Sequence, residues 1–196
     1  MVRQEVFESD THEREALELE FADWAAARTA EERAAVARWQ GPDRFYQRVQ
    51  SPAEHDFEAQ DVRDAIIDLA TSHVMSADRR LWRGIRSCQS TFGVDAASLE
   101  NVVGDAATTD RLTAATPLRV VAESEFSKPA LDGGGALLCI VARKGTPAAF
   151  LATVGRRDMA YQCEVVFPPG LRMRMLRVDR SVLIPVVVVE FQRRSR

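Results

Sequence analysis

The stretch AYQCEVVFPPGLRM, residues 160–173, has the pattern of a strand that ends in a tight turn. Its apolar residues 165–167 favour a buried strand, and Pro168-Pro169-Gly170 favours a turn. Because side chains alternate along a strand, Gln162 and Glu164 are expected on one face. Such a polar face belongs either to an amphipathic outer strand or to the wall of a site, and the spacing alone favours the outer strand.

The chain on either side of this stretch is rich in short strands. RLWRGIR, residues 80–86, reads as a strand, and residues 95–103 as a short helix capped by Asp95. Further strands are predicted at residues 117–126, 136–142, 147–151, 160–168, 171–179 and 182–192. Many short strands without long helices between them favour an antiparallel β-sandwich over a parallel sheet.

The first third of the chain has a helical period instead. Helices are predicted over residues 12–28, from a Thr29–Glu32 capping box to about Trp39, from Ser51-Pro52, and over residues 57–75. The expected fold class is therefore α+β, with N-terminal helices followed by an antiparallel β-sandwich core. We expect a single domain over residues 1–196, with a helical part at 1–78 and a β-rich catalytic core at 79–196.

Composition excludes several classes of function. The 196 residues are 46% hydrophobic with a net charge of −3, which is typical of a globular protein and argues against broad electrostatic binding to nucleic acid or membranes. The three cysteines are expected to be reduced thiols, and the three histidines lack metal-ligand spacing, so no metal is predicted. The longest apolar run, residues 182–189, is too short to span a bilayer, and the chain is expected to be cytoplasmic as synthesised.

Two further segments carry candidate site residues. Arg83 lies inside an apolar strand, where it needs an anion, and the following Gly84 allows a ligand or another backbone to approach; an exposed edge strand explains the pair equally well. Ser124 and Ser127 lie in VVAESEFSKPAL, residues 120–131, where a serine can simply cap a turn. Glu123 and Glu125 beside Ser124 fit solvent-facing positions equally well.

The order of these segments resembles the R-S-E class of mono-ADP-ribosyltransferases, which includes bacterial exoenzymes, polymorphic toxins and phage relatives. LWRGI (81–85) is similar to its Arg-Gly strand, LLCIVARKGTPAAFL (137–151) to its Leu-Leu-x-Ile segment, and YQCEVVFPPGLRMRMLRV (161–178) to its Gln-x-Glu variant with Pro-Pro-Gly. WQGPDRFYQRVQS (39–51) is similar to the stretch before its β core. The family's aromatic-x-Ser-Thr-Ser is altered here to residues 122–127, so either Ser124 or Ser127 is the candidate serine.

The resemblance implies a reaction in which NAD⁺ is cleaved at the nicotinamide–ribose bond and ADP-ribose passes to an acceptor. NAD would be the co-substrate. Glu164 would stabilise the oxocarbenium-like ribose, Arg83 with Gly84 would bind the diphosphate, and Ser124 or Ser127 would orient Glu164. Phe150 would stack on nicotinamide, although a core phenylalanine is an equal alternative.

Gln162 is implied to orient the acceptor. An amide can pair with another amide or a base edge but cannot act as a base, so an asparagine or glutamine side chain or a nucleic-acid base is favoured over arginine. The implied partners are a macromolecular acceptor, protein or nucleic acid, and a cognate immunity protein; we expect a monomer that does not bind membranes and that enters a target cell without an N-terminal signal. The alternatives are an NAD⁺ glycohydrolase and a catalytically inactive binding or structural module with the same fold.

Overall fold

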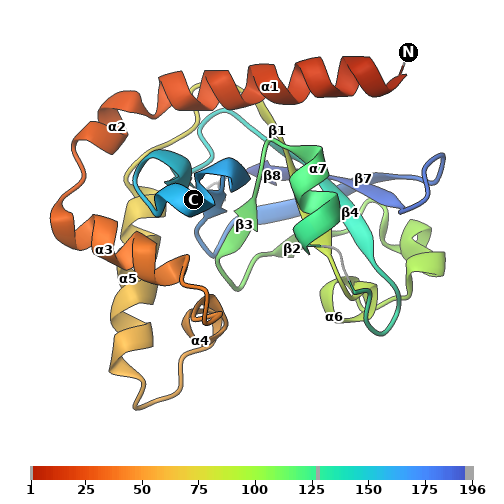
Figure 1. Ribbon diagram of the computed structural model, residues 1–196. Coiled ribbons are helices and arrows are strands. Elements are labelled where there is room, and N and C mark those ends of the chain that lie inside the picture. The colour runs from red at the N-terminus through yellow and green to blue at the C-terminus, as the bar shows by residue number, and fades with distance from the viewer. Residues whose placement is uncertain (1, 127–128, 193–196) are drawn as a thin grey trace.

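The computed structural model describes residues 2–126 and 129–192 of the chain. Helices come first and strands follow, which confirms the α+β class; α1 runs across the top of the molecule in Figure 1, and α3, α4 and α5 lie together at one side. The helices are α1 (Val2–Glu20), α2 (Ala22–Ala26), α3 (Ala30–Trp39), α4 (Tyr46–Gln50), α5 (Phe57–Thr71), α6 (Cys88–Phe92) and α7 (Arg119–Val121), with 3-10 helices η1 (Ala96–Val102), η3 (Leu151–Thr153) and η4 (Arg157–Gln162) and the π-helix η2 (Ala122–Phe126). The strands are β1 (Arg79–Ile85), β2 (Ala106–Thr108), β3 (Thr113–Ala115), β4 (Ala136–Ala142), β5 (Ala149–Phe150), β6 (Val165–Phe167), β7 (Arg172–Asp179) and β8 (Val186–Gln192).

The strands form two sheets. The larger has the order β1-β4-β8-β7-β2 and the smaller the order β3-β6-β5. Strands β4 and β8 pair in parallel and all other pairs are antiparallel, so the core is a mixed sheet rather than the strictly antiparallel sandwich expected from the sequence. Phe167 of β6 and Phe191 of β8 meet edge-on with ring centroids 5.2 Å apart, which joins the sheets through the core.

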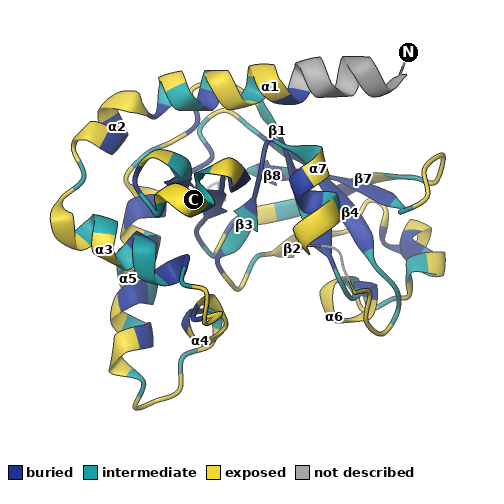
Figure 2. Cartoon of the chain, in the orientation of Figure 1, coloured by how far each residue is buried: buried dark blue, intermediate teal, exposed yellow. Residues whose placement is uncertain are grey.

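The central strands of the larger sheet, β4 and β8, are covered on both faces and are dark in Figure 2. Along β4, Leu138 and Ile140 belong to the main core, whereas Leu137 and Cys139 pack on the opposite face with Trp82 of β1. This explains why β4 reads as a continuous apolar run instead of an alternating one. The three cysteines are buried and free, as expected.

Two helices of the helical part, α3 and α5, begin with a side-chain cap. The predicted capping box is confirmed: the Thr29 hydroxyl accepts from the Glu32 amide, and the Glu32 carboxylate accepts from the Thr29 amide. The helix predicted from Ser51-Pro52 is wrong, because residues 51–56 are not helical. The separate helix predicted over residues 57–75 is confirmed as α5, which begins at Phe57, where the Asp56 side chain accepts from the Ala59 amide.

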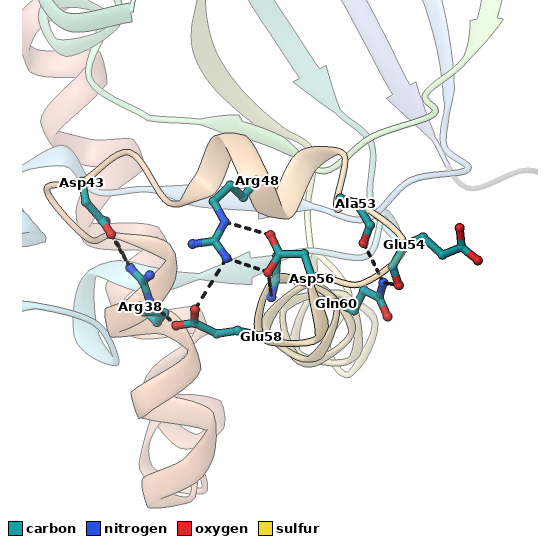
Figure 3. A network of polar contacts seen from close by, with 9 residues as sticks. Arg38, Asp43, Arg48, Ala53, Glu54, Asp56, Glu58 and Gln60 are labelled. Atoms are coloured by element: carbon teal, nitrogen blue, oxygen red, sulfur yellow. Dashed lines mark hydrogen bonds and ion pairs between the residues drawn. The ribbon is translucent and has the colours of Figure 1, made fainter.

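A network of arginines and carboxylates holds the ends of α3 and α5 together (Figure 3). Arg38 at the end of α3 pairs with Asp43 at 2.8 Å and with Glu58 of α5 at 2.7 Å. Arg48 of α4 pairs with Asp56, the N-cap of α5, at 2.6 Å. Exposed ion pairs contribute little to stability singly, but several charges joined in one network can contribute more.

The predicted strand at 117–126 is wrong: this segment forms α7 and η2. Consecutive valines favoured a strand, but local polar contacts favour a helix here. Arg119 pairs with Glu123 four residues later at 2.7 Å, and the Ser124 hydroxyl donates to the Val120 carbonyl at 2.8 Å. Just before this segment lies the short strand β3, which the sequence analysis missed; Thr116, directly after β3, forms an antiparallel bridge with Trp82 of β1.

The predicted strand at 160–168 is only partly correct. Strand β6 covers Val165–Phe167, whereas η4 ends at Gln162 and Cys163 adopts a left-handed conformation with φ of 47°. Gln162 therefore belongs to η4 and Glu164 precedes β6, so the prediction that both lie on one face of one strand is wrong. The predicted helix at 95–103 is the 3-10 helix η1; Asp95 stands at its N-cap without a side-chain hydrogen bond.

Candidate active site

A cavity of about 750 Å³ lies between the helical part and the two sheets. Its walls come from the segment that links α3 to α4, from the end of β1, from β3, and from the segment around Gln162 and Glu164. Its volume lies in the range of small-molecule and cofactor sites. Four of the residues proposed from sequence line it, namely Arg83, Gly84, Gln162 and Glu164.

Glu164 is the buried carboxylate of this cavity, with 8% of the residue exposed. The Trp39 indole Nε1 donates to its Oε1 at 2.9 Å, and the Gln40 amide Nε2 donates to its Oε2 at 3.0 Å. Its backbone carbonyl accepts from the Leu151 amide at 2.8 Å, which holds residue 164 at the start of β6. Burial raises the pKa of Glu164, while the hydrogen bonds from Gln40 and Trp39 and the charge of Arg83 act in the opposite direction.

Arg83 extends into the cavity from β1, which pairs with β4 so that Arg83 lies opposite Leu138. Its Nη1 donates to the Ala114 carbonyl of β3 at 2.7 Å. Among the described residues this is its one side-chain hydrogen bond, so guanidinium N–H groups remain for an anionic ligand. Burial lowers the pKa of Arg83, and the Glu164 carboxylate opposes that shift.

Gln162 is buried at the end of η4 and contacts a carboxylate that the sequence analysis left as solvent-facing. Its Nε2 donates to Glu125 Oε2 at 2.8 Å, and the Tyr161 hydroxyl donates to the same oxygen at 3.1 Å. Glu125 also lines the cavity. The signal that could have identified Glu125 is its position two residues before the candidate Ser127.

Neither Ser124 nor Phe150 lines the cavity. Ser124 is exposed and bonded to the Val120 carbonyl, and Ser127 lies outside the described residues. Ala114 and Ala115 of β3 line the cavity beside Arg83. Phe150 is completely buried in the main core, with its ring centroid 5.9 Å from that of Phe21, so the core alternative describes its place.

The cavity carries charges of both signs. Arg44 and Arg86 join Arg83 in its walls, and Glu125 and Glu164 supply carboxylates. Cationic side chains suit an anionic group such as a phosphate, and carboxylates suit a positive charge, so the cavity can take a ligand that carries both. In the described part of the chain no three His, Cys, Asp or Glu side chains are grouped to hold a metal ion. None of the described helices has the length and apolar character needed to cross a membrane.

Comparison with known proteins gives matches at the level of structure. No protein-family model matches the sequence, and no curated protein is detectably similar to it. Plx2a, an ADP-ribosyltransferase toxin from Paenibacillus larvae, superposes with a TM-score of 0.73 at 9% identity, over 93% of this chain and 96% of that one. BECa, the ADP-ribosylating toxin of a C. perfringens binary enterotoxin, solved with NADH, gives 0.71 at 14% identity over 95% of this chain and 49% of that one.

C3stau2 from S. aureus, solved with NAD, gives a TM-score of 0.61 at 12% identity, over 87% of this chain and 90% of that one. Identities this low establish the fold alone. The helices, the two sheets and the cavity between them therefore form the fold of the bacterial ADP-ribosyltransferase toxins.

Proposed function

We propose that this chain is a mono-ADP-ribosyltransferase that cleaves NAD⁺ and transfers ADP-ribose to a macromolecular acceptor. The observation that carries the proposal is Glu164, a buried carboxylate held by two hydrogen-bond donors in a cavity whose wall also contains Arg83. The fold shared with toxins solved with NAD and NADH supports NAD⁺ as the co-substrate.

Each residue of the site has a role in this reaction. Ionised Glu164 stabilises the positive charge that develops on the ribose as the bond to nicotinamide breaks. Arg83 binds the diphosphate through its remaining N–H groups, and Gly84, which has no side chain, leaves room for the ligand beside it. The buried position of Glu164 keeps water from weakening its electrostatic effect.

Gln162 orients the acceptor in this proposal. The amide nitrogen of Gln162 donates to Glu125 Oε2 at 2.8 Å, so this N–H is already engaged. The Gln162 carbonyl oxygen then remains to pair with an amide side chain or a base edge. An asparagine, a glutamine or a nucleic-acid base fits Gln162 better than arginine does, because an amide cannot remove a proton from a guanidinium.

Two other functions share this cavity. An NAD⁺ glycohydrolase would use water as the acceptor at the same carboxylate. A binding module without catalysis is favoured by one observation: among the described residues the lining of the cavity contains no serine. A toxin role with delivery into a target cell and a cognate immunity protein belongs to the transferase proposal, since the proteins of similar fold are toxins.

The test uses labelled NAD⁺, purified protein and cell lysate, followed by digestion with protease, DNase or RNase to identify which treatment releases the label. Glu164→Ala should abolish both NAD⁺ cleavage and labelling, and Gln162→Ala should keep cleavage but lower labelling. Equal loss of cleavage in Gln162→Ala would remove its acceptor role. Wild type that neither binds nor cleaves NAD⁺ would favour the binding module.

A further inference from the structure

The C-terminal end of α3 reaches the cavity through two consecutive residues. Trp39 is the last residue of α3 and Gln40 is its C-cap, and they are 3% and 6% exposed. Gly41-Pro42 follows, and proline prevents the helix from continuing. The ion pairs of Arg38 with Asp43 and Glu58 hold this end of the helix in place.

Both oxygens of the Glu164 carboxylate are occupied by donors from this helix end. Trp39 Nε1 lies 2.9 Å from Oε1, and Gln40 Nε2 lies 3.0 Å from Oε2. One donor on each oxygen fixes the rotation of the carboxylate as well as its position. Because both donors are neutral, they stabilise the ionised carboxylate without cancelling its charge.

Gln40 has a second contact on the opposite side of its amide. Its Oε1 accepts from the Arg156 backbone amide at 3.0 Å. A Cβ atom built on Gly155 would lie only 2.1 Å from the same oxygen, so the absence of a side chain at 155 is what permits the contact. One buried amide thus connects Glu164 with the loop that leads into η4 and Gln162.

No other element provides this support among the described residues. Ser124, one of the two serines expected to orient Glu164, is exposed and bonded to Val120, and the nearest part of β3 presents Ala114 and Ala115. The charged and titratable groups that share the cavity with Glu164 are Arg83 and Arg86 from β1 and its end, Arg44 and Tyr46 from the segment after α3, and Glu125 from η2.

We infer that Trp39 and Gln40 are positioning residues that hold the Glu164 carboxylate in the orientation needed for NAD⁺ cleavage. The inference rests on the proposed function. In this chain the end of α3 holds both carboxylate oxygens. Gln40 also links Glu164 to the segment that leads to Gln162.

The test compares Trp39→Phe and Gln40→Met, which remove one donor each and preserve most of the side-chain volume. Trp24→Phe is the matched control, because Trp24 is 7% exposed and its Nε1 donates to the Ser72 hydroxyl, away from the cavity. We measure the kcat of NAD⁺ cleavage against pH, the KM for NAD⁺ and the Tm. Separately, ¹³C NMR of glutamate carboxyl groups, with Glu164→Gln used for assignment, follows the ionisation of Glu164.

Each loss of a donor should raise the pKa of Glu164 by about one unit, which is a tenfold change in its ionisation constant. The acid limb of the profile of kcat against pH should shift to higher pH by the same amount. The kcat should fall by roughly tenfold or more, while the KM for NAD⁺ stays close to that of wild type. Trp24→Phe should change neither the profile nor the NMR titration.

An unchanged Glu164 titration in folded Trp39→Phe and Gln40→Met proteins would overturn the inference. So would an equal loss of kcat in Trp24→Phe. Because the NMR titration needs no turnover, its result stands if wild type fails to cleave NAD⁺. The failure of the proposed function and the failure of the positioning role are therefore distinguishable.

Discussion

Phe150 is a residue for which the family resemblance and the structure lead to different predictions, and the sequence itself left the core position open. The family resemblance implies a ring that stacks on nicotinamide, whereas the structure places Phe150 in the core with no exposed surface. Removing the ring in Phe150→Ala loses its full burial energy and leaves a cavity beside Phe21, which together cost about 3–5 kcal/mol. For a chain of 196 residues this lowers the Tm by about 6–20 °C.

The assay is urea unfolding of Phe150→Ala and of the milder Phe150→Leu, with NAD⁺ kinetics for the second variant. Natural domains have about 5–15 kcal/mol of stability, so Phe150→Ala can leave little folded protein at 37 °C, and Phe150→Leu keeps the kinetic test available. The structure predicts lower stability and an unchanged KM for NAD⁺ in Phe150→Leu. A KM raised about tenfold, or ~1.4 kcal/mol, with unchanged stability would refute this reasoning.

Three further predictions follow from particular contacts. Gly155→Ala forces a Cβ against Gln40 Oε1 and should cost about 1–3 kcal/mol of stability, as measured by urea unfolding. It should also lower NAD⁺ cleavage, as measured by nicotinamide release. Wild-type stability and cleavage in this variant would contradict the close approach. Asp56→Ala removes the N-cap of α5 and should lower the free energy of unfolding by about 1–2 kcal/mol in the same assay. Arg48→Ala, which removes only the ion pair with Asp56, should lower it by less than about 1 kcal/mol. Equal losses in the two variants would contradict the capping role. Burial raises the pKa of Glu164 above 4.5, so ionisation of this carboxyl is less favourable in the folded state than in the unfolded state. Wild type should therefore lose stability relative to Glu164→Gln as the pH rises above 4.5, as measured by unfolding at a series of pH values. A stability difference that does not depend on pH would contradict this.

Features with local causes were predictable from the sequence. The Thr29–Glu32 capping box places its own partners three residues apart, and strand β4 at residues 136–142 is a continuous run of apolar residues between turn signals. Arg83 and Glu164 could be proposed for one cavity because their order along the chain resembled a known family.

Features that depend on distant contacts were not predictable in this way. Glu164 and Trp39 are 125 residues apart in the chain, so no local pattern indicates that the indole donates to the carboxylate. Glu125 reaches Gln162 only because residues 117–126 fold as short helices, and the valines in that segment favoured a strand instead. The left-handed Cys163 likewise broke the strand on which Gln162 and Glu164 were expected.

The most direct test of the proposed chemistry is the release of nicotinamide from NAD⁺, measured by chromatography for wild type and for Glu164→Gln at equal concentration. Glutamine preserves most of the volume of the side chain but cannot supply a negative charge. The proposal predicts release by wild type and a fall of about 10²–10³-fold in the variant. Equal rates in the two folded proteins, or no release by wild type, would contradict it.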